Sequence, residues 1–224
     1  MRRFFAVFLC FFMLGIVPAR SETPKYVALT FDDGPSGRFT RRLLTGLQER
    51  DARATFLLCG YRLEIYPELA QRIVEEGHEI GLHGYSHKDM AKLSRRELTR
   101  EIQDTLSLLP QGCEPAFLRP PGGSESKAVA EIAEKMGLSL LLWSVDPRDW
   151  EVDDASVVET AVISQVRDGD VILLHDLSDS SVDAALSIVD KLQAEGFAFV
   201  TVSQLAQIRG VAPQPGKTYR HFRG

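Results

Sequence analysis

Residues 26–36 read Tyr26-Val27-Ala28-Leu29-Thr30-Phe31-Asp32-Asp33-Gly34-Pro35-Ser36. The first half is an unbroken apolar run, which is typical of a buried parallel strand. The second half places two adjacent carboxylates directly before a Gly-Pro break. Side chains alternate between the faces of a strand, but a strand that turns at its end can bring both carboxylates into one cleft. Asp and Gly are also common in simple turns, so this stretch alone does not separate a turn from a site.

Similar apolar runs recur along the chain, and segments with helical periodicity separate them. We expect strands at 26–31, 54–58, 78–82, 116–118, 138–145, 171–174 and 197–202. We expect helices near 39–50, 66–77, 94–109, 127–136, 155–166, 182–195 and 204–208. This alternation predicts an α/β fold, a distorted (β/α) barrel with about seven parallel strands. The alternative is an open doubly wound sheet, but no Gly-rich nucleotide fingerprint follows any strand.

The composition indicates one globular domain, since 224 residues with 44% hydrophobic and 25% charged side chains can bury a sizeable core. The formal net charge is -5, and removal of residues 1–21 would make it three charges more negative. An acidic chain argues against nucleic acid as a partner.

The N-terminal segment has the three parts of a secretory signal peptide. Arg2 and Arg3 precede an apolar run over 4–17, and the small residues Ala19 and Ser21 follow. We expect cleavage near Ala19 or Ser21, and a protein that is secreted, periplasmic or in the cell envelope. The alternative is an uncleaved anchor, but the apolar run is short of the roughly 20 residues that span a bilayer, so we expect no membrane span after cleavage. Residues 22–210 then form the domain, and the polar, Pro- and Gly-rich residues 211–224 form a mobile tail.

Export would leave Cys59 and Cys113 in an oxidising compartment. Cys59 follows a predicted strand, whereas Cys113 precedes one. The two positions lie at opposite ends of a parallel barrel, too far apart for a disulfide, so we predict two free thiols.

Polar residues follow two of the predicted strands in a pattern that suits a metal ion. Asp33, His83 and His87 offer one carboxylate and two imidazoles, which fit Zn²⁺ or a similar divalent ion with open positions. The spacing of four lets both imidazoles face one point if residues 83–87 form a helical turn. Surface histidines at this spacing are also common, so the placement after a strand carries the inference.

Five ordered stretches together resemble the motifs of the polysaccharide deacetylases, the NodB-like carbohydrate esterase family 4. The resemblance spans about residues 25–208. The stretches are Thr30-Phe31-Asp32-Asp33-Gly34-Pro35, His83-Gly84-Tyr85-Ser86-His87, Arg119-Pro120-Pro121-Gly122-Gly123, Asp146 to Trp150, and Leu173-Leu174-His175.

The resemblance implies metal-dependent removal of acetyl groups from an N-acetylated glycan such as peptidoglycan or chitin-type N-acetylglucosamine polymer. It assigns Asp33, His83 and His87 to the metal, which would be Zn²⁺, Co²⁺, Ni²⁺ or Mn²⁺. It assigns Asp32 as general base and His175 as general acid. These roles agree with the chemistry of a carboxylate beside a metal-activated water and of a proton donor to the departing amine.

Two further pairs are expected from the resemblance. Arg119 should pair with Asp32, which keeps that carboxylate ionised and oriented. Asp149 should contact His175 and favour its charged form. Asp146 is an alternative partner of His175, and the sequence does not separate the two acids.

Trp150 and Leu173 are expected to line the groove for the sugar and the acetyl methyl group. A backbone N–H near Gly122, or in the loop after Asp33, is expected to receive the developing oxyanion. Gly84 and Gly122 depart from the family pattern. Gly84 replaces the usual Ser or Thr, whose hydrogen bond steadies the metal loop, and Gly122 replaces a common Tyr in the groove wall.

These departures leave alternatives open. An O-acetyl esterase or a small-amide hydrolase could use the same fold, and a non-catalytic glycan-binding protein would need a broken set of site residues. We expect a monomer. We expect no role in the site for His78, His221, Asp176 and Asp179, of which the two acids are expected in loops.

Overall fold

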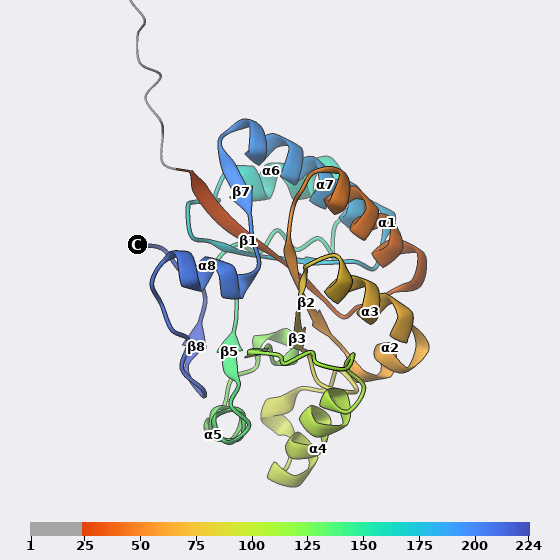
Figure 1. Ribbon diagram of the computed structural model, residues 1–224, viewed down its shortest axis with the longest axis vertical. Coiled ribbons are helices and arrows are strands. Elements are labelled where there is room, and N and C mark those ends of the chain that lie inside the picture. Colours follow the sequence, from red (N-terminus) through yellow and green to blue (C-terminus); the bar gives the residue numbers. More distant parts are fainter. Residues whose placement is uncertain (1–23) are drawn as a thin grey trace, which may run out of the picture.

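Strands and helices alternate along the chain as the sequence predicts. The computed structural model describes residues 24–224. Its helices and strands, in chain order, are β1 (Lys25–Asp32), α1 (Gly37–Glu49), β2 (Ala54–Leu58), α2 (Gly60–Ile65), α3 (Pro67–Glu75), β3 (Glu79–Leu82), α4 (Arg95–Leu106), β4 (Phe117–Leu118), α5 (Lys127–Lys135), β5 (Ser139–Leu141), α6 (Ala155–Ile163), β6 (Val171–His175), α7 (Asp179–Ala194), β7 (Phe197–Phe199), α8 (Val202–Ile208) and β8 (Thr218–Tyr219). In Figure 1, α1, α2 and α3 lie to the right of the strands, α6 and α7 above them, and α4 and α5 below.

Strand β1 lies inside a parallel sheet whose order is β6-β1-β2-β3-β4-β5-β8, and β7 pairs with the first residues of β1. Asp32, the last residue of β1, is in register with His175 of β6. Beyond β5, a parallel bridge between Val145 and Ile172 brings the two sides of the sheet together. The sheet therefore curls, which confirms the predicted distorted (β/α) barrel of about seven parallel strands, with β8 as an added short strand.

The helices begin and end close to their predicted bounds. Ser94 caps the N-terminus of α4, and its side chain and that of Glu97 form a capping box. Leu98 and Ile102, on the inner side of α4, are fully buried. Helix α2 is absent from the sequence-based interpretation, because six residues are too few to show helical periodicity.

Strand β5 is shorter than predicted. The sequence predicts a strand over 138–145, whereas β5 ends at Leu141. The buried guanidinium of Arg119 donates hydrogen bonds to the backbone carbonyls of Leu141 and Leu142, at 3.2 and 3.0 Å. The side chain of Arg119 therefore occupies acceptors that a continued strand would use, and the chain leaves the sheet there.

The C-terminal segment packs on the domain, which differs from the mobile tail predicted for residues 211–224. Strand β8 extends the sheet beside β5. The ring of Phe222 is 2% exposed and stacks on Tyr219 with centroids 5.5 Å apart. Arg223 forms an ion pair of 2.6 Å with the fully buried Asp170. The Pro- and Gly-rich composition gives no sign of these contacts. The pocket for Phe222 and the buried carboxylate of Asp170 form only when the chain folds.

Cys59 and Cys113 are both free thiols, as predicted. Cys59 is buried at the end of β2, and Cys113 is partly buried before β4. Burial raises the pKa of both thiols. Neither is therefore suited to act as a nucleophile at neutral pH.

The termini bear on the relation of the protein to membranes. Across residues 24–224, every helix falls short of the length and apolar character that crossing a membrane requires. The predicted signal peptide, residues 1–21, lies outside the described residues, and so do Arg2, Arg3 and the predicted cleavage positions. The signal peptide and its cleavage therefore stay predictions.

Candidate active site

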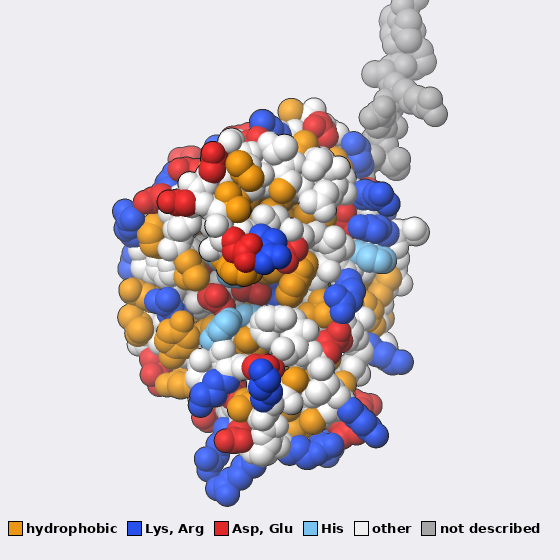
Figure 2. Space-filling view, turned by 180° about the vertical axis from the view of Figure 1, so that it is seen from behind, with side chains coloured by type: hydrophobic (Ala, Val, Ile, Leu, Met, Phe, Trp, Pro, Cys, Tyr) orange, Lys and Arg blue, Asp and Glu red, His pale blue; other side chains and the backbone are white. Residues whose placement is uncertain are grey.

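The carboxyl ends of the strands surround a cavity of about 460 Å³. Figure 2 shows it as a hollow in the molecular face with acidic and histidine side chains inside. Eight of the ten residues that the sequence assigns to the site line the cavity: Asp32, Asp33, His83, His87, Gly122, Trp150, Leu173 and His175. The other two, Arg119 and Asp149, lie behind the lining residues and are 0% and 3% exposed. Trp143, Asp146, Arg148 and Leu177 complete the lining.

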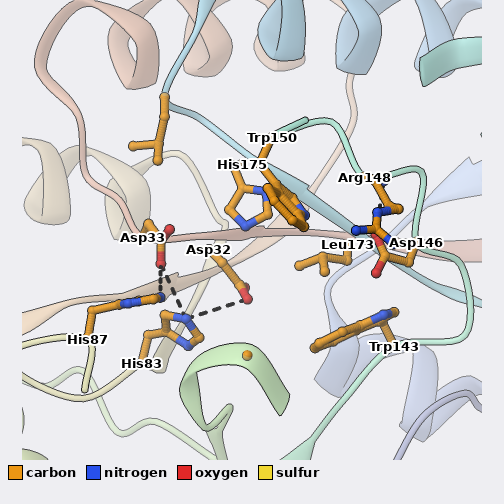
Figure 3. A pocket seen from close by; sticks show the side chains of 12 residues that line it. Asp32, Asp33, His83, His87, Trp143, Asp146, Arg148, Trp150, Leu173 and His175 are labelled. Atoms are coloured by element: carbon orange, nitrogen blue, oxygen red, sulfur yellow. Dashed lines mark hydrogen bonds and ion pairs between the residues drawn. The ribbon is translucent and has the colours of Figure 1, made fainter. Parts of the chain in front are cut away.

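Three side chains at one end of the cavity converge, and Figure 3 shows them pointing toward one another. Oδ1 of Asp33 lies 3.3 Å from Nε2 of His83 and 3.0 Å from Nε2 of His87. The sequence-based grouping of these residues is thus present in the structure.

The histidines do not converge through a helical turn, which the sequence spacing suggested. Residues 83–87 form a loop in which Gly84 and His87 have φ of 79° and 56°, in the left-handed region. Asp33 has a φ of 70°. Such φ values are uncommon for residues other than glycine. The backbone at Asp33 and at His87 is therefore held in an unfavourable conformation, which directs their ligand atoms into the cavity.

The donor set fits a divalent cation. Nδ1 of His83 lies 2.7 Å from the backbone carbonyl oxygen of Arg119, and a carbonyl only accepts, so we assign the proton to Nδ1. The lone pair of Nε2 then faces Asp33, whose Oδ1 is buried without a hydrogen-bond partner among the described residues. Two lone pairs that face each other call for a cation between them, and the carbonyl partner is the usual orienting contact of a metal-bound imidazole.

Without an ion, protonated imidazoles can balance the charge of the Asp33 carboxylate. Burial would raise the pKa of Asp33, but the two neighbouring imidazoles outweigh burial and hold the pKa below its usual range. The Asp33 carboxylate in turn raises the pKa of His87. A carboxylate that stays ionised in a mostly buried place is suited to a positive partner.

Asp32 pairs with Arg119, which confirms the predicted contact. Nη1 of Arg119 donates to Oδ1 of Asp32 at 2.6 Å and to the hydroxyl of Thr30 at 2.8 Å. Both partners of this ion pair are almost completely buried. Oδ2 of Asp32 lies 3.7 Å from Nε2 of His83, on the cavity side. One carboxylate oxygen is therefore fixed, and the other is available beside the candidate metal ligands.

His175 contacts Asp149, so the structure separates the two acids that the sequence left open. Oδ1 of Asp149 lies 2.8 Å from Nδ1 of His175, and Oδ2 accepts the backbone N–H of His175 at 2.8 Å. Asp146 is exposed and accepts the backbone N–H of Arg148 instead. Burial alone would lower the pKa of His175, but Asp149 outweighs it, with help from Asp32 and Asp33, and raises the pKa to about 9.

The apolar side of the cavity contains the predicted lining residues. Leu173 lies almost buried in the wall, and Trp150 stands at the rim, 59% exposed. The guanidinium of Arg148 lies 5.2 Å from the ring centroid of Trp150. A Cβ atom added to Gly122 would meet nothing within 4 Å. The wall is therefore open at Gly122. Trp143 also lines the cavity but has no sequence signal as a site residue, because it falls inside the predicted strand 138–145.

Asp176 lies in the loop between β6 and α7, as expected, and it is fully buried there. Its carboxylate accepts the hydroxyl of Thr40, and its backbone carbonyl accepts the hydroxyl of Ser36 at 2.6 Å. A Cβ atom on Gly34 would lie 2.7 Å from Oδ1 of Asp176. Burial raises the pKa of Asp176 to about 7. This acid packs beneath the turn that follows Asp33.

The other residues that the sequence places outside the site do lie outside the cavity lining. His78 is buried, and its Nδ1 accepts the backbone N–H of Ala54 at 3.1 Å, which is a structural contact as expected. His221 is exposed. Asp179 is the first residue of α7 and not a loop acid as expected, and it pairs with Arg38 on the surface.

Known proteins resemble the chain in sequence and in structure. The family model described as polysaccharide deacetylase matches residues 19–141. A peptidoglycan-N-acetylglucosamine deacetylase of Bacillus cereus is 36% identical over 191 residues, which cover 83% of this chain and 90% of that protein. The peptidoglycan-N-acetylmuramic acid deacetylase PdaC of Bacillus subtilis is 38% identical over 187 residues, which cover 83% of this chain and 39% of PdaC.

Among solved structures, a family 4 acetyl xylan esterase from Clostridium thermocellum in complex with a cobalt ion has a TM-score of 0.82 and 33% identity. The match covers 88% of this chain and 98% of the esterase. The chain spans about two fifths of the length of the first curated relatives, PdaC among them. Together with the family model, these matches show that the chain belongs to the polysaccharide deacetylase family.

Proposed function

We propose that the protein is an exported, metal-dependent deacetylase that hydrolyses N-acetyl groups of an amino-sugar polymer of the peptidoglycan or chitin type. The observation that carries the proposal is the convergence of Asp33, His83 and His87 beside Asp32 and His175 in one cavity. The curated relatives, which are named peptidoglycan deacetylases, support this choice of substrate.

Asp33, His83 and His87 would hold the ion, which is Zn²⁺ or else Co²⁺, Ni²⁺ or Mn²⁺. An ion at this place supplies Lewis acidity, which polarises a carbonyl oxygen and lowers the pKa of a water. The cobalt ion of the structurally similar esterase supports a divalent ion on this fold.

Asp32 is the proposed general base. Arg119 occupies Oδ1 of its carboxylate and leaves Oδ2 on the cavity side. Oδ2 therefore accepts the proton of the water that attacks the acetyl carbonyl. A backbone N–H near Gly122, or in the loop after Asp33, is the proposed donor to the developing oxyanion.

His175 is the proposed general acid. Asp149 holds Nδ1, so the other edge of the imidazole faces the cavity. With a pKa raised to about 9, the ring is protonated at neutral pH and can give its proton to the departing amine. Leu173 and Trp150 supply apolar surface for the acetyl methyl group and the sugar.

Two alternatives to an N-deacetylase are a hydrolase with another substrate and a glycan-binding protein without catalysis. An O-acetyl esterase or a small-amide hydrolase is favoured by the open wall at Gly122 and by the acetyl xylan esterase among the similar structures. A glycan-binding protein without catalysis is disfavoured, because both proton-transfer groups keep their orienting partners.

Metal removal is expected to abolish acetate release. Purified protein would be assayed on N-acetylglucosamine polymers, peptidoglycan and acetylated xylan, before and after treatment with a chelator, with Zn²⁺ and Co²⁺ added back. Restoration by either ion is expected, because the three ligands are preformed. Full activity in chelated protein contradicts metal dependence. Faster acetate release from acetylated xylan than from the amino-sugar polymers favours the O-acetyl esterase. Glycan binding without acetate release favours the non-catalytic glycan-binding protein.

Export is proposed from the signal-peptide pattern of residues 1–21 and from the cell-wall substrates named for the relatives. The full chain expressed in a bacterium is expected in the envelope or medium with a new N-terminus near residue 20 or 22. N-terminal sequencing and fractionation check this, and an uncleaved cytoplasmic protein contradicts it.

A further inference from the structure

The loop between the two candidate metal histidines is bound by a carboxylate from a neighbouring helix. Glu101 lies in α4, and its Oε2 accepts the backbone N–H groups of Tyr85 and Ser86 at 2.8 and 2.7 Å. Its Oε1 accepts the hydroxyl of Ser86 at 2.5 Å. One side chain therefore receives three hydrogen bonds from the residues that separate His83 from His87.

The backbone of this loop needs such a partner. Gly84 and His87, on either side of the two donors, have left-handed φ values of 79° and 56°. Successive N–H groups in a turn of this kind form a concave anion site, and a carboxylate is the natural occupant. Unfavourable conformations persist only where surrounding contacts determine them. Glu101 supplies these contacts for the loop.

Gly84 stands where the family usually has a Ser or Thr, whose hydrogen bond steadies the metal loop. Another contact must therefore hold the loop in this protein. A Cβ atom at Gly84 would lie 2.7 Å from Cε of Met90 and 3.3 Å from Oε2 of Glu101. A side chain at this position would therefore need Met90 and Glu101 to shift, and the left-handed φ of 79° would strain it. The stabilising contact comes from Glu101 instead.

The helix that carries Glu101 is itself firmly placed. The capping box of Ser94 and Glu97 defines its first turn. Leu98 and Ile102 are fully buried in the core on its inner side. A rigid support of this kind can hold a ligand loop within the narrow tolerance that metal coordination requires.

We infer that Glu101 is a positioning residue of the candidate metal centre, which fixes the 83–87 loop so that both imidazoles reach one ion. The inference rests on the proposed function, since it presumes that Asp33, His83 and His87 bind a metal. It predicts that loss of the Glu101 carboxylate weakens metal binding without removing a ligand.

The test is the affinity of purified protein for Co²⁺, measured through visible absorption in competition with a chelator at a temperature where every variant is folded. Glu101→Ala is expected to weaken Co²⁺ binding by about 10- to 100-fold, as is usual when the orienting partner of a metal ligand is lost. Glu101→Gln keeps one acceptor oxygen, so an intermediate loss is expected. The Co²⁺ absorption spectrum is expected to change in both variants.

Glu97→Ala is the matched control, because Glu97 lies one turn earlier on the same helix and contacts Ser94 rather than the loop. It is expected to lower the midpoint of thermal unfolding through loss of the capping box, with unchanged Co²⁺ affinity. Equal Co²⁺ affinity in Glu101→Ala and the parent, or an equal loss in Glu97→Ala, overturns the inference alone. A parent protein that binds no Co²⁺ overturns the proposed function, and the inference with it.

Discussion

Asp32→Asn is expected to lower the rate of acetate release by about 10³-fold, the typical contribution of a positioned general base. The amide has nearly the shape of the carboxylate, and its oxygen can still accept the hydrogen bond from Nη1 of Arg119. It cannot take a proton from the attacking water. Metal affinity and thermal stability should stay close to those of the parent, because Asp33, His83 and His87 are untouched. Single-turnover acetate release and Co²⁺ titration measure the two properties separately.

Asp153→Asn removes the same charge from an exposed position that has no part in the proposed mechanism, so its activity should match the parent. If Asp32→Asn kept a rate within about tenfold of the parent, Asp32 could not be the general base. If it lost the metal together with the activity, Asp32 would be a ligand and the proposed division between Asp32 and Asp33 would be wrong.

Much of the fold could be predicted, because the features that define it are local. The apolar run before Asp32 and Asp33 and the Gly34-Pro35 break mark both the end of β1 and the site edge. Since parallel strands end at one edge, the histidines after β3 and at the end of β6 could be placed near these acids without knowledge of the register.

The parts that could not be predicted depend on contacts between distant segments. Glu101 lies on the polar side of an amphipathic helix, where a carboxylate that binds a loop looks the same as a solvated one. Asp176 lies in a loop as expected, but its burial could not be predicted, because it comes from packing against Thr40 in α1. The left-handed conformation of His87 and the burial of Phe222 likewise arise from tertiary contacts and have no local pattern.

Asp149→Asn is expected to lower the pKa of His175 and to move the alkaline limit of activity to lower pH. In the parent, a pKa of about 9 keeps His175 protonated through neutral pH, so activity that needs the acid should fall only as the pH rises through that value. Without the Asp149 carboxylate, burial lowers the pKa of His175, while Asp32 at the end of β1 and the adjacent Asp33 still favour the charged ring. At an ordinary histidine pKa of about 6.5, roughly 3% of the rings are protonated at pH 8, against about 90% in the parent, which predicts a loss of about 30-fold.

The same variant should regain most of its activity at about pH 6, where His175 is protonated again even at that ordinary pKa. A merely structural defect would not be reversed by acid, so the pH profile separates the two explanations. An NMR titration of the His175 imidazole in the metal-free protein measures the pKa directly. Asp146→Asn is the matched control for this titration, because Asp146 bonds to the backbone of Arg148 and not to the ring. An unshifted His175 pKa in Asp149→Asn, or an equal shift in Asp146→Asn, would remove Asp149 from its proposed role, since the acid would then owe its charge to another group.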